Sequence, residues 1–136
     1  MTHSRSALSY LNYGLLLLVL LVYQQAHAGE ITGGWVKKQQ SIRGEWKIEE
    51  RADGHYLILG DDFRTRRAPD LKFVLSKQSV DSVQSSTAMN DALLIAPLES
   101  ARGAQEYKLP ENFADYSSLL LHCEQYTKLW GAAALR

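Results

Sequence analysis

The sequence is poor in cysteine and histidine, and this scarcity excludes several kinds of chemistry. Cys123 is the only cysteine among 136 residues, so the chain can close no disulfide bond of its own. Neither a C-x-x-C nor a C-x-x-C-H motif occurs, which leaves thioredoxin-like chemistry and covalent haem attachment unsupported. No Ser/His/Asp arrangement is suggested, and Asp61 and Asp62 lack the spacing of a calcium loop. We therefore expect no catalytic residue and no metal site.

An excess of charge of either sign is also missing. The chain carries 15 lysines and arginines against 15 aspartates and glutamates, for a net charge of zero with histidine neutral. Such a chain has no overall field that would attract nucleic acid or anionic lipid. The sequence therefore predicts no nucleic-acid partner.

A hydrophobic run long enough to cross a membrane is lacking as well. After Arg5, residues 14–23 (GLLLLVLLVY) are apolar, whereas a spanning helix needs about 20 such residues. Ala26-His27-Ala28 follows and has the small residues that a signal peptidase requires. We predict that residues 1–28 are a cleavable signal peptide and that the chain is exported, as a periplasmic or secreted protein. No stable membrane anchor would remain after cleavage.

Removal of the predicted signal leaves 108 residues, a length typical of one domain. Apolar and polar residues alternate over 42–49, which predicts a half-buried strand. Asp53-Gly54 then supplies a turn into the β-rich run 56–59, and together these segments predict a hairpin. Further strands are expected at 71–76, 92–96 and 105–109, with a polar surface loop at 78–90.

The C-terminal tail, residues 116–135, fits two structures. Its apolar residues recur at helical spacing, which favours an amphipathic helix. Gly131 would cost about 1 kcal/mol inside that helix. The same tail also divides into two short strands, 119–123 and 129–135, around a polar segment. The local pattern leaves both structures open.

Several motifs occur in an order that resembles one known family. The first half has Gly44 in the alternating strand, Leu57 and Leu59 before Asp62-Phe63, and Ala68-Pro69-Asp70-Leu71 leading into Phe73-Val74-Leu75-Ser76. The second half has AQEYKLP at 104–110, YSSL at 116–119, HCEQY at 122–126 and WGAAAL at 130–135. From about Trp35 to the C-terminus, the chain resembles the DM-thirteen domain, a family described as an electron-transfer domain. Two residues depart from the family pattern: Ala68 stands where glycine is usual, and His122 stands where an aromatic residue commonly precedes the cysteine.

The resemblance implies an all-β fold, with a single antiparallel β-sandwich domain over residues 29–136. It therefore favours strands over a helix in the tail. It also implies an association with extracytoplasmic redox systems, in which the partner is a redox protein or a membrane cytochrome. Cys123 lies in the matching HCEQY segment and is the redox candidate. A lone thiol would need a partner thiol or a bound cofactor, and the sequence does not identify such a cofactor.

The residues around Cys123 also fit a purely structural role. In a strand, Cys123 shares a face with Leu119 and Leu121, and free cysteine in apolar surroundings is commonly a small core residue. His122 would point to the opposite face and could not easily join the thiol as a second ligand. Two hypotheses follow. One is an extracytoplasmic accessory domain with an electron-transfer role centred on Cys123 and without stand-alone enzymatic activity, and the other is a non-catalytic β-sandwich that binds a protein or a surface polymer.

The remaining polar and aromatic residues have simple structural interpretations. His55 is expected on a surface strand, and the Asp70 carboxylate is expected to accept backbone N–H groups and fix the turn after Pro69. A basic cluster formed by Arg64, Arg66 and Arg67 could hold an anionic glycan or lipid head group, but a solvated loop is the simpler interpretation. Large aromatic residues usually build the core of a small domain. We expect this role for Trp35, Trp46 and Trp130.

Overall fold

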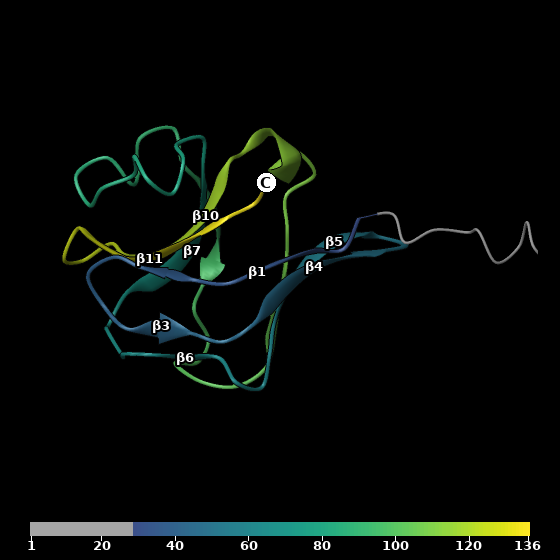
Figure 1. Ribbon diagram of the computed structural model, residues 1–136, viewed down its shortest axis with the longest axis horizontal. Helices are drawn as coiled ribbons and strands as arrows, with labels where there is room; N and C mark the ends of the chain where they lie inside the picture. The colour runs from purple at the N-terminus through teal and green to yellow at the C-terminus, as the bar shows by residue number, and fades with distance from the viewer. Residues whose placement is uncertain (1–28) are drawn as a thin grey trace, which may run out of the picture.

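The computed structural model describes residues 29–136, and the predicted signal peptide, residues 1–28, lies outside them. This part of the chain consists of short strands and one 3-10 turn, with no α-helix (Figure 1). The strands are β1 (Ile31–Gly33), β2 (Val36–Lys37), β3 (Ile42–Arg43), β4 (Trp46–Arg51), β5 (Gly54–Leu59), β6 (Arg64–Thr65), β7 (Leu71–Ser76), β8 (Leu93–Pro97), β9 (Gln105–Lys108), β10 (Ser118–Cys123) and β11 (Lys128–Ala134). The 3-10 turn η1 spans Phe113–Asp115.

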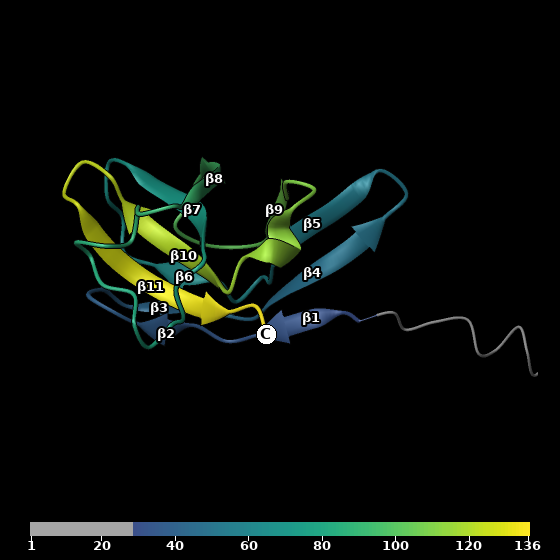
Figure 2. The same cartoon turned by 90° about the horizontal axis from the view of Figure 1, so that it is seen from above.

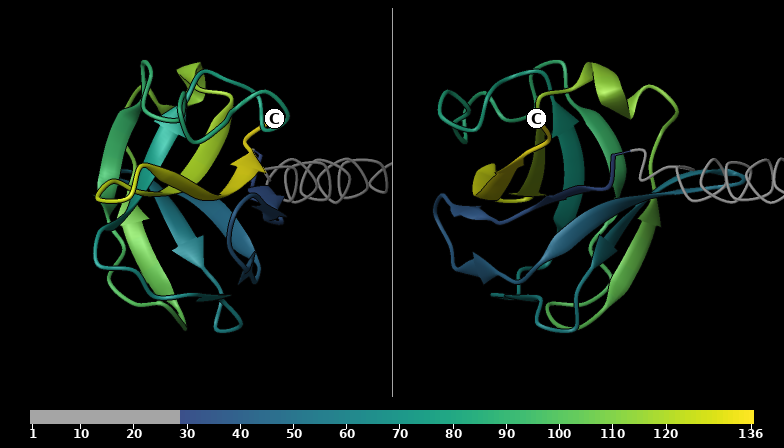
Figure 3. Two further views of the ribbon diagram at one scale, coloured as in Figure 1. Left: turned by 90° about the vertical axis from the view of Figure 1, so that its left-hand side faces the viewer. Right: turned by 45° about the vertical axis from the view of Figure 1, so that its right-hand side comes forward.

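The strands form two larger sheets and one small one, and every pairing is antiparallel. One sheet has the order β1-β4-β5-β9, the second has the order β2-β11-β10-β7-β8, and β3 pairs with β6. Figure 2 shows the β4–β5 hairpin on one side of the molecule and β7, β10 and β11 on the other. Figure 3 shows the sheets curving around a common interior. The predicted all-β sandwich is confirmed.

The alternating segment 42–49 forms two strands and not the single strand that its pattern predicts. Gly44 interrupts it with a φ of 109°, a left-handed value that L side chains rarely adopt. A Cβ atom at Gly44 would lie 2.5 Å from the Cα of Phe63, so the close approach of the chain after β3 to the chain before β6 also requires glycine. The predicted apolar face survives the break, because Ile42, Trp46 and Ile48 are all buried.

The other local predictions agree with the structure. β4 and β5 form the expected hairpin, with Arg51 opposite Gly54, whose φ of 136° suits the turn. β7, β8 and β9 lie at the expected strands, and 78–90 is a chain of turns. This loop packs Val83 and Ala88 against the outer face of the five-stranded sheet.

The tail forms two strands, β10 and β11, so its helical periodicity is misleading. β10 lies between β7 and β11, and all six of its residues are buried. A strand buried on both faces has no alternating pattern. β11 also contains a bulge: Leu121 pairs with Gly131 and His122 pairs with Leu129, so Trp130 is an extra residue. The bulge shifts the alternation by one position, and this shift produces the apparent helical spacing.

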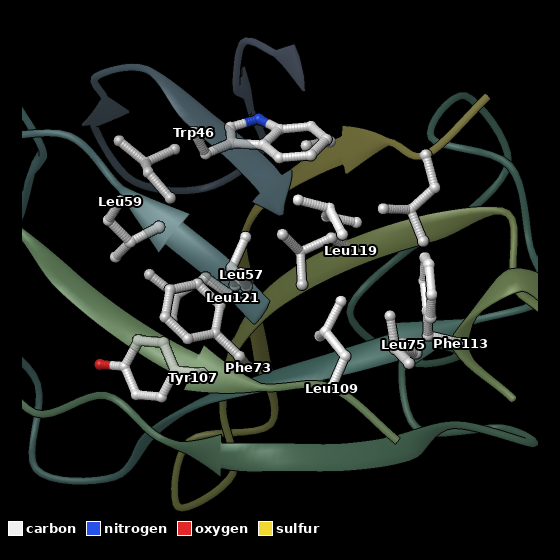
Figure 4. Close-up of a cluster of buried hydrophobic side chains, with 14 of the residues drawn as sticks. Trp46, Leu57, Leu59, Phe73, Leu75, Tyr107, Leu109, Phe113, Leu119 and Leu121 are labelled. Carbon is white, nitrogen blue, oxygen red and sulfur yellow. The ribbon is translucent and has the colours of Figure 1, made fainter. Parts of the chain in front are cut away.

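The main core lies between the two larger sheets (Figure 4). Its labelled members come from both sheets, from the residue after β9 and from η1: Trp46, Leu57, Leu59, Phe73, Leu75, Tyr107, Leu109, Phe113, Leu119 and Leu121. A second, smaller cluster lies on the outer face of the five-stranded sheet, beneath the 78–90 loop. This cluster includes Val74, Leu120, Leu129 and Ala132. β10 contributes to both clusters and is the most enclosed strand of the domain.

Candidate functional site

Cys123, the predicted redox residue, is the last residue of β10 and is fully buried, with 0% of its surface exposed. It belongs to the main core together with Leu119 and Leu121, as its position on a strand predicts. Its cross-strand partners are Leu71 on β7 and Lys128 on β11. The thiol is free and lies inside the protein, where no reagent can reach it without movement of the chain.

The segment 66–71 ends at the cross-strand partner of Cys123 and is held by Trp130. The bulge turns Trp130 toward the same core cluster as Cys123. The Trp130 indole Nε1 donates a hydrogen bond to the Arg66 carbonyl at 3.3 Å. Leu71, at the end of this segment, is the direct partner of Cys123 across β7 and β10. Access to the thiol therefore requires displacement of core side chains or opening of this end of the sheet.

His122 points away from Cys123, as expected for consecutive residues of a strand. It is 1% exposed, and neither ring nitrogen has a hydrogen-bond partner within residues 29–136. Burial lowers the pKa of His122, and the positive charge of Lys72 acts in the same direction, against the opposing effects of Glu124 and Asp70. The Lys72 ammonium lies between those two carboxylates and pairs with both. His122 is therefore a neutral, enclosed imidazole next to an ion-pair cluster.

The sequence pattern predicts apolar surroundings for Cys123, but it does not predict that His122 is enclosed as well. The available signal is the position of His122 inside the run Leu119–Cys123, which becomes a central strand. The two side chains lie on opposite faces and do not form a joint ligand set. Within residues 29–136, no group of three or more His, Cys, Asp or Glu residues is arranged to hold a metal ion.

The turn-fixing role predicted for Asp70 belongs to Asp62 in the structure. The Asp70 carboxylate pairs with Lys72 Nζ at 3.3 Å and does not fix the turn by accepting backbone N–H groups. Asp62 does so instead, because its carboxylate oxygens accept the Glu45 backbone N–H at 3.1 and 3.2 Å. Asp62 thereby ties the turn before β6 to the start of β4.

The three tryptophans belong to or pack against the main core, as predicted for a small domain. Trp35 connects the first strands of the two sheets and lies 6.0 Å from Phe73 and 6.2 Å from Trp46, measured between ring centroids. His55 packs against Phe113 with 4.8 Å between ring centroids. Trp46 and Trp130 are 2% and 6% exposed, so they are core residues and are not suited to sugar stacking.

Among the surface hollows, two differ in their relation to Cys123. The larger, about 640 Å³, lies where β1, β4 and β5 meet, and Gly33, Gly34, Trp46 and Ile58 are among its lining residues. A smaller hollow, about 290 Å³, lies between segments 67–71 and 97–101. Cys123 lines neither hollow, but Leu71 lines the smaller one and is the cross-strand partner of Cys123. The smaller hollow therefore marks the surface next to the thiol.

The basic cluster is larger in the structure than in the sequence. Arg43 on β3 lies directly opposite Arg64 on β6, and the Arg64 backbone also pairs with that of Arg102 in an isolated antiparallel β-bridge. Arg66 and Arg67 continue from β6 and are exposed. Arg43 and Arg102 are far from the cluster in sequence, and only the pairing of three separate segments brings them to it.

These features define an all-β domain that encloses a single thiol between antiparallel sheets. The sequence model of the family described as electron transfer DM13 matches residues 35–135. The chain belongs to the DM13 electron-transfer family, and the resemblance noted from its motifs is confirmed. No curated protein and no solved structure matches the chain. No helix within residues 29–136 has the length and apolar character needed to cross a membrane.

Proposed function

We propose that the chain is an exported accessory domain that takes part in electron transfer through Cys123, with a redox protein or a membrane cytochrome as its partner. Membership of the DM13 electron-transfer family carries this proposal. The thiol is the only cysteine of the chain. It stands at the end of β10, next to the turn that leads to β11, where local opening disrupts fewer contacts than in mid-strand.

The burial of Cys123 restricts the chemistry. Cys123 lines neither of the two hollows, and the His122 imidazole lies on the opposite face of the sheet. In this conformation, the surroundings of the thiol therefore do not fit a large bound cofactor. Direct exchange with a disulfide of the partner protein suits it better. In that step, the Cys123 thiolate attacks one sulfur of the partner disulfide, a new S–S bond forms, and the second sulfur leaves as a thiolate. A thiolate of a second protein, a dithiol donor, then attacks the Cys123 sulfur, and the reduced partner leaves as its second thiolate. The other thiolate of the donor attacks the donor sulfur of this new mixed disulfide and releases Cys123, so two electrons pass from the donor dithiol to the partner disulfide.

The alternative function is a non-catalytic module that binds a protein or a surface polymer. The complete burial of Cys123 favours this alternative, because enclosed cysteines usually serve as small apolar side chains. The two functions differ in one measurable property: whether the thiol becomes accessible without global unfolding.

Labelling of the purified exported protein with a disulfide reagent tests the proposal. If Cys123 is functional, the labelling rate is independent of urea at low concentrations, because local opening exposes little surface. If Cys123 is only a core residue, the rate rises with urea along the slope of global unfolding. The proposal fails if Cys123 is labelled only through global unfolding and the protein has neither a bound chromophore nor a mixed disulfide trapped from cells. The binding module then becomes the preferred function.

Export is tested separately by the mass of the protein recovered outside the cytoplasm. The Ala26-His27-Ala28 motif predicts an N-terminus at Gly29. A recovered protein that retains residues 1–28 would contradict this part of the proposal.

A further inference from the structure

Three arginines from separate segments form a row on the surface, called here the arginine row: Arg43, Arg64 and Arg102. Arg43 and Arg64 are direct partners in the β3–β6 pair, and Arg64 and Arg102 are partners in an adjacent antiparallel bridge. Side chains directly opposite in antiparallel strands lie on the same face, with Cβ atoms about 4.5–5.5 Å apart. Figure 1 shows β3 and β6 side by side along one edge of the molecule.

No carboxylate within residues 29–136 neutralises the arginine row. The ion pairs in this part of the chain use the basic residues Lys47, Arg51, Lys72 and Lys108. The nearby Asp62 carboxylate is occupied by the backbone N–H of Glu45. Arg64 donates to the carbonyls of Asp61 and Phe63, which hold the guanidinium without removing its charge.

Like charges placed directly opposite one another destabilise a sheet. The row thus weakens the free domain, and a bound anion would relieve the repulsion. Arg66 and Arg67 are exposed and extend the positive surface along the chain after β6. Because the whole chain is neutral, this positive field is local and favours a partner that docks at one site.

The position of the arginine row indicates the kind of partner. The Arg66 carbonyl accepts the hydrogen bond from Trp130, which belongs to the same core cluster as Cys123. Arg67 lines the smaller hollow together with Leu71, the cross-strand partner of Cys123. The positive surface therefore adjoins the end of the domain where the thiol lies. A partner held there has its reactive group next to the segment that must open.

We propose that the arginine row, extended by Arg66 and Arg67, is the docking surface for an acidic face of the redox partner protein; this inference rests on the proposed electron-transfer function. Guanidinium groups bind carboxylates through paired hydrogen bonds, which fixes orientation as well as position. Redox partners associate through small, weak interfaces, and complementary charge raises their encounter rate. A membrane or an anionic glycan would not require the positive surface to lie beside Cys123.

Anisotropy of a fluorescent peptide of six glutamates tests the docking surface with the purified exported protein. The R43E/R102E variant should weaken peptide binding by about tenfold or more. K37E/K77E is the matched control, because it makes the same change of charge at exposed lysines outside the ion pairs, and it should change binding by less than about threefold. R43Q/R102Q provides a second test that introduces no negative charge. Far-ultraviolet circular dichroism verifies that each variant is folded.

Equal weakening by the two glutamate variants would show only general attraction and would overturn the proposal. Tighter binding to phosphatidylglycerol vesicles than to the peptide would also overturn it, in favour of a membrane surface. The outcome is independent of the thiol experiment. If Cys123 is not labelled by local opening but R43E/R102E selectively loses peptide binding, the electron-transfer role is rejected and an anion-binding surface is retained. If Cys123 is labelled by local opening but R43E/R102E shows no selective loss of peptide binding, only the docking surface is rejected.

Discussion

His122 and Cys123 are consecutive residues of β10, and their side chains lie on opposite faces of one sheet. Cys123 belongs to the core between the two larger sheets, whereas His122 faces the side that carries the 78–90 loop. Both are almost completely buried. Any opening that exposes the thiol must therefore move a strand whose other face holds an imidazole without hydrogen-bond partners.

Acid should destabilise the domain through His122. Burial lowers the pKa of His122 in the folded protein, so the unfolded chain takes up its proton first as the pH falls. The stability due to the neutral imidazole is present above the unfolded pKa of about 6.5 and is lost as the pH falls toward the folded pKa. Urea unfolding at about pH 7.5 and pH 5 should show a smaller loss for His122→Phe than for the unmodified protein.

His55→Phe is the control for that comparison, since it removes the other histidine of residues 29–136, which packs against Phe113. If His122→Phe loses as much stability between the two pH values as the unmodified protein, titration of His122 does not limit stability.

Replacement of Cys123 should lower stability whatever its function. Cys123→Ala removes a fully buried sulfur, and Cys123→Ser places a hydroxyl group in the same apolar site. Each should cost about 1–3 kcal/mol of unfolding free energy, measured by urea denaturation. The exposed Gln125→Ala on the adjacent turn should stay within about 0.5 kcal/mol of the unmodified protein. If Cys123→Ala leaves the unfolding free energy unchanged, the thiol is not part of a tightly packed core.

Trp130→Phe should make the thiol more accessible. The change keeps an aromatic ring in the core but removes the indole N–H that binds the Arg66 carbonyl, so the segment next to Cys123 loses a tether. We expect a loss of about 0.5–1.5 kcal/mol and faster labelling of Cys123 at low urea. Trp46→Phe removes a comparable indole bond, to the Gly34 carbonyl, from another part of the fold. Equal acceleration in both variants would indicate general destabilisation and not a local cover.

Gly44→Ala should be among the most damaging single changes at a glycine. The φ of 109° is unfavourable for alanine, and the new Cβ would lie 2.5 Å from the Cα of Phe63. Both effects act on backbone that cannot easily move, so we expect a loss of about 2 kcal/mol or more. Gly34→Ala is the control, because a Cβ there meets no atom within 4 Å. Similar midpoints of thermal unfolding for the two variants would contradict this account of Gly44.

The parts of the fold that could be predicted are those with local signals. Asp53-Gly54 specifies a hairpin through turn chemistry that involves only neighbouring residues. The tail could not be resolved locally, because burial of both faces of β10 and the bulge at Trp130 depend on strands distant in sequence. The sequence predicts only part of the arginine row for the same reason, since Arg43 and Arg102 come next to Arg64 only through strand pairing. Cys123 was found through motif order, and its complete burial became visible with the central position of β10.

The 78–90 loop has a consequence for engineering this domain. A polar, serine-rich connection normally suggests a place where tags or reporter segments can be inserted without harm. Here Val83 and Ala88 cover β10 and β11 from outside, and the Ser85 hydroxyl accepts the Leu129 backbone N–H at 2.9 Å. A shortened or interrupted loop would leave the strand that carries Cys123 open to water on its second face. Tags and reporter segments should therefore be kept out of this loop.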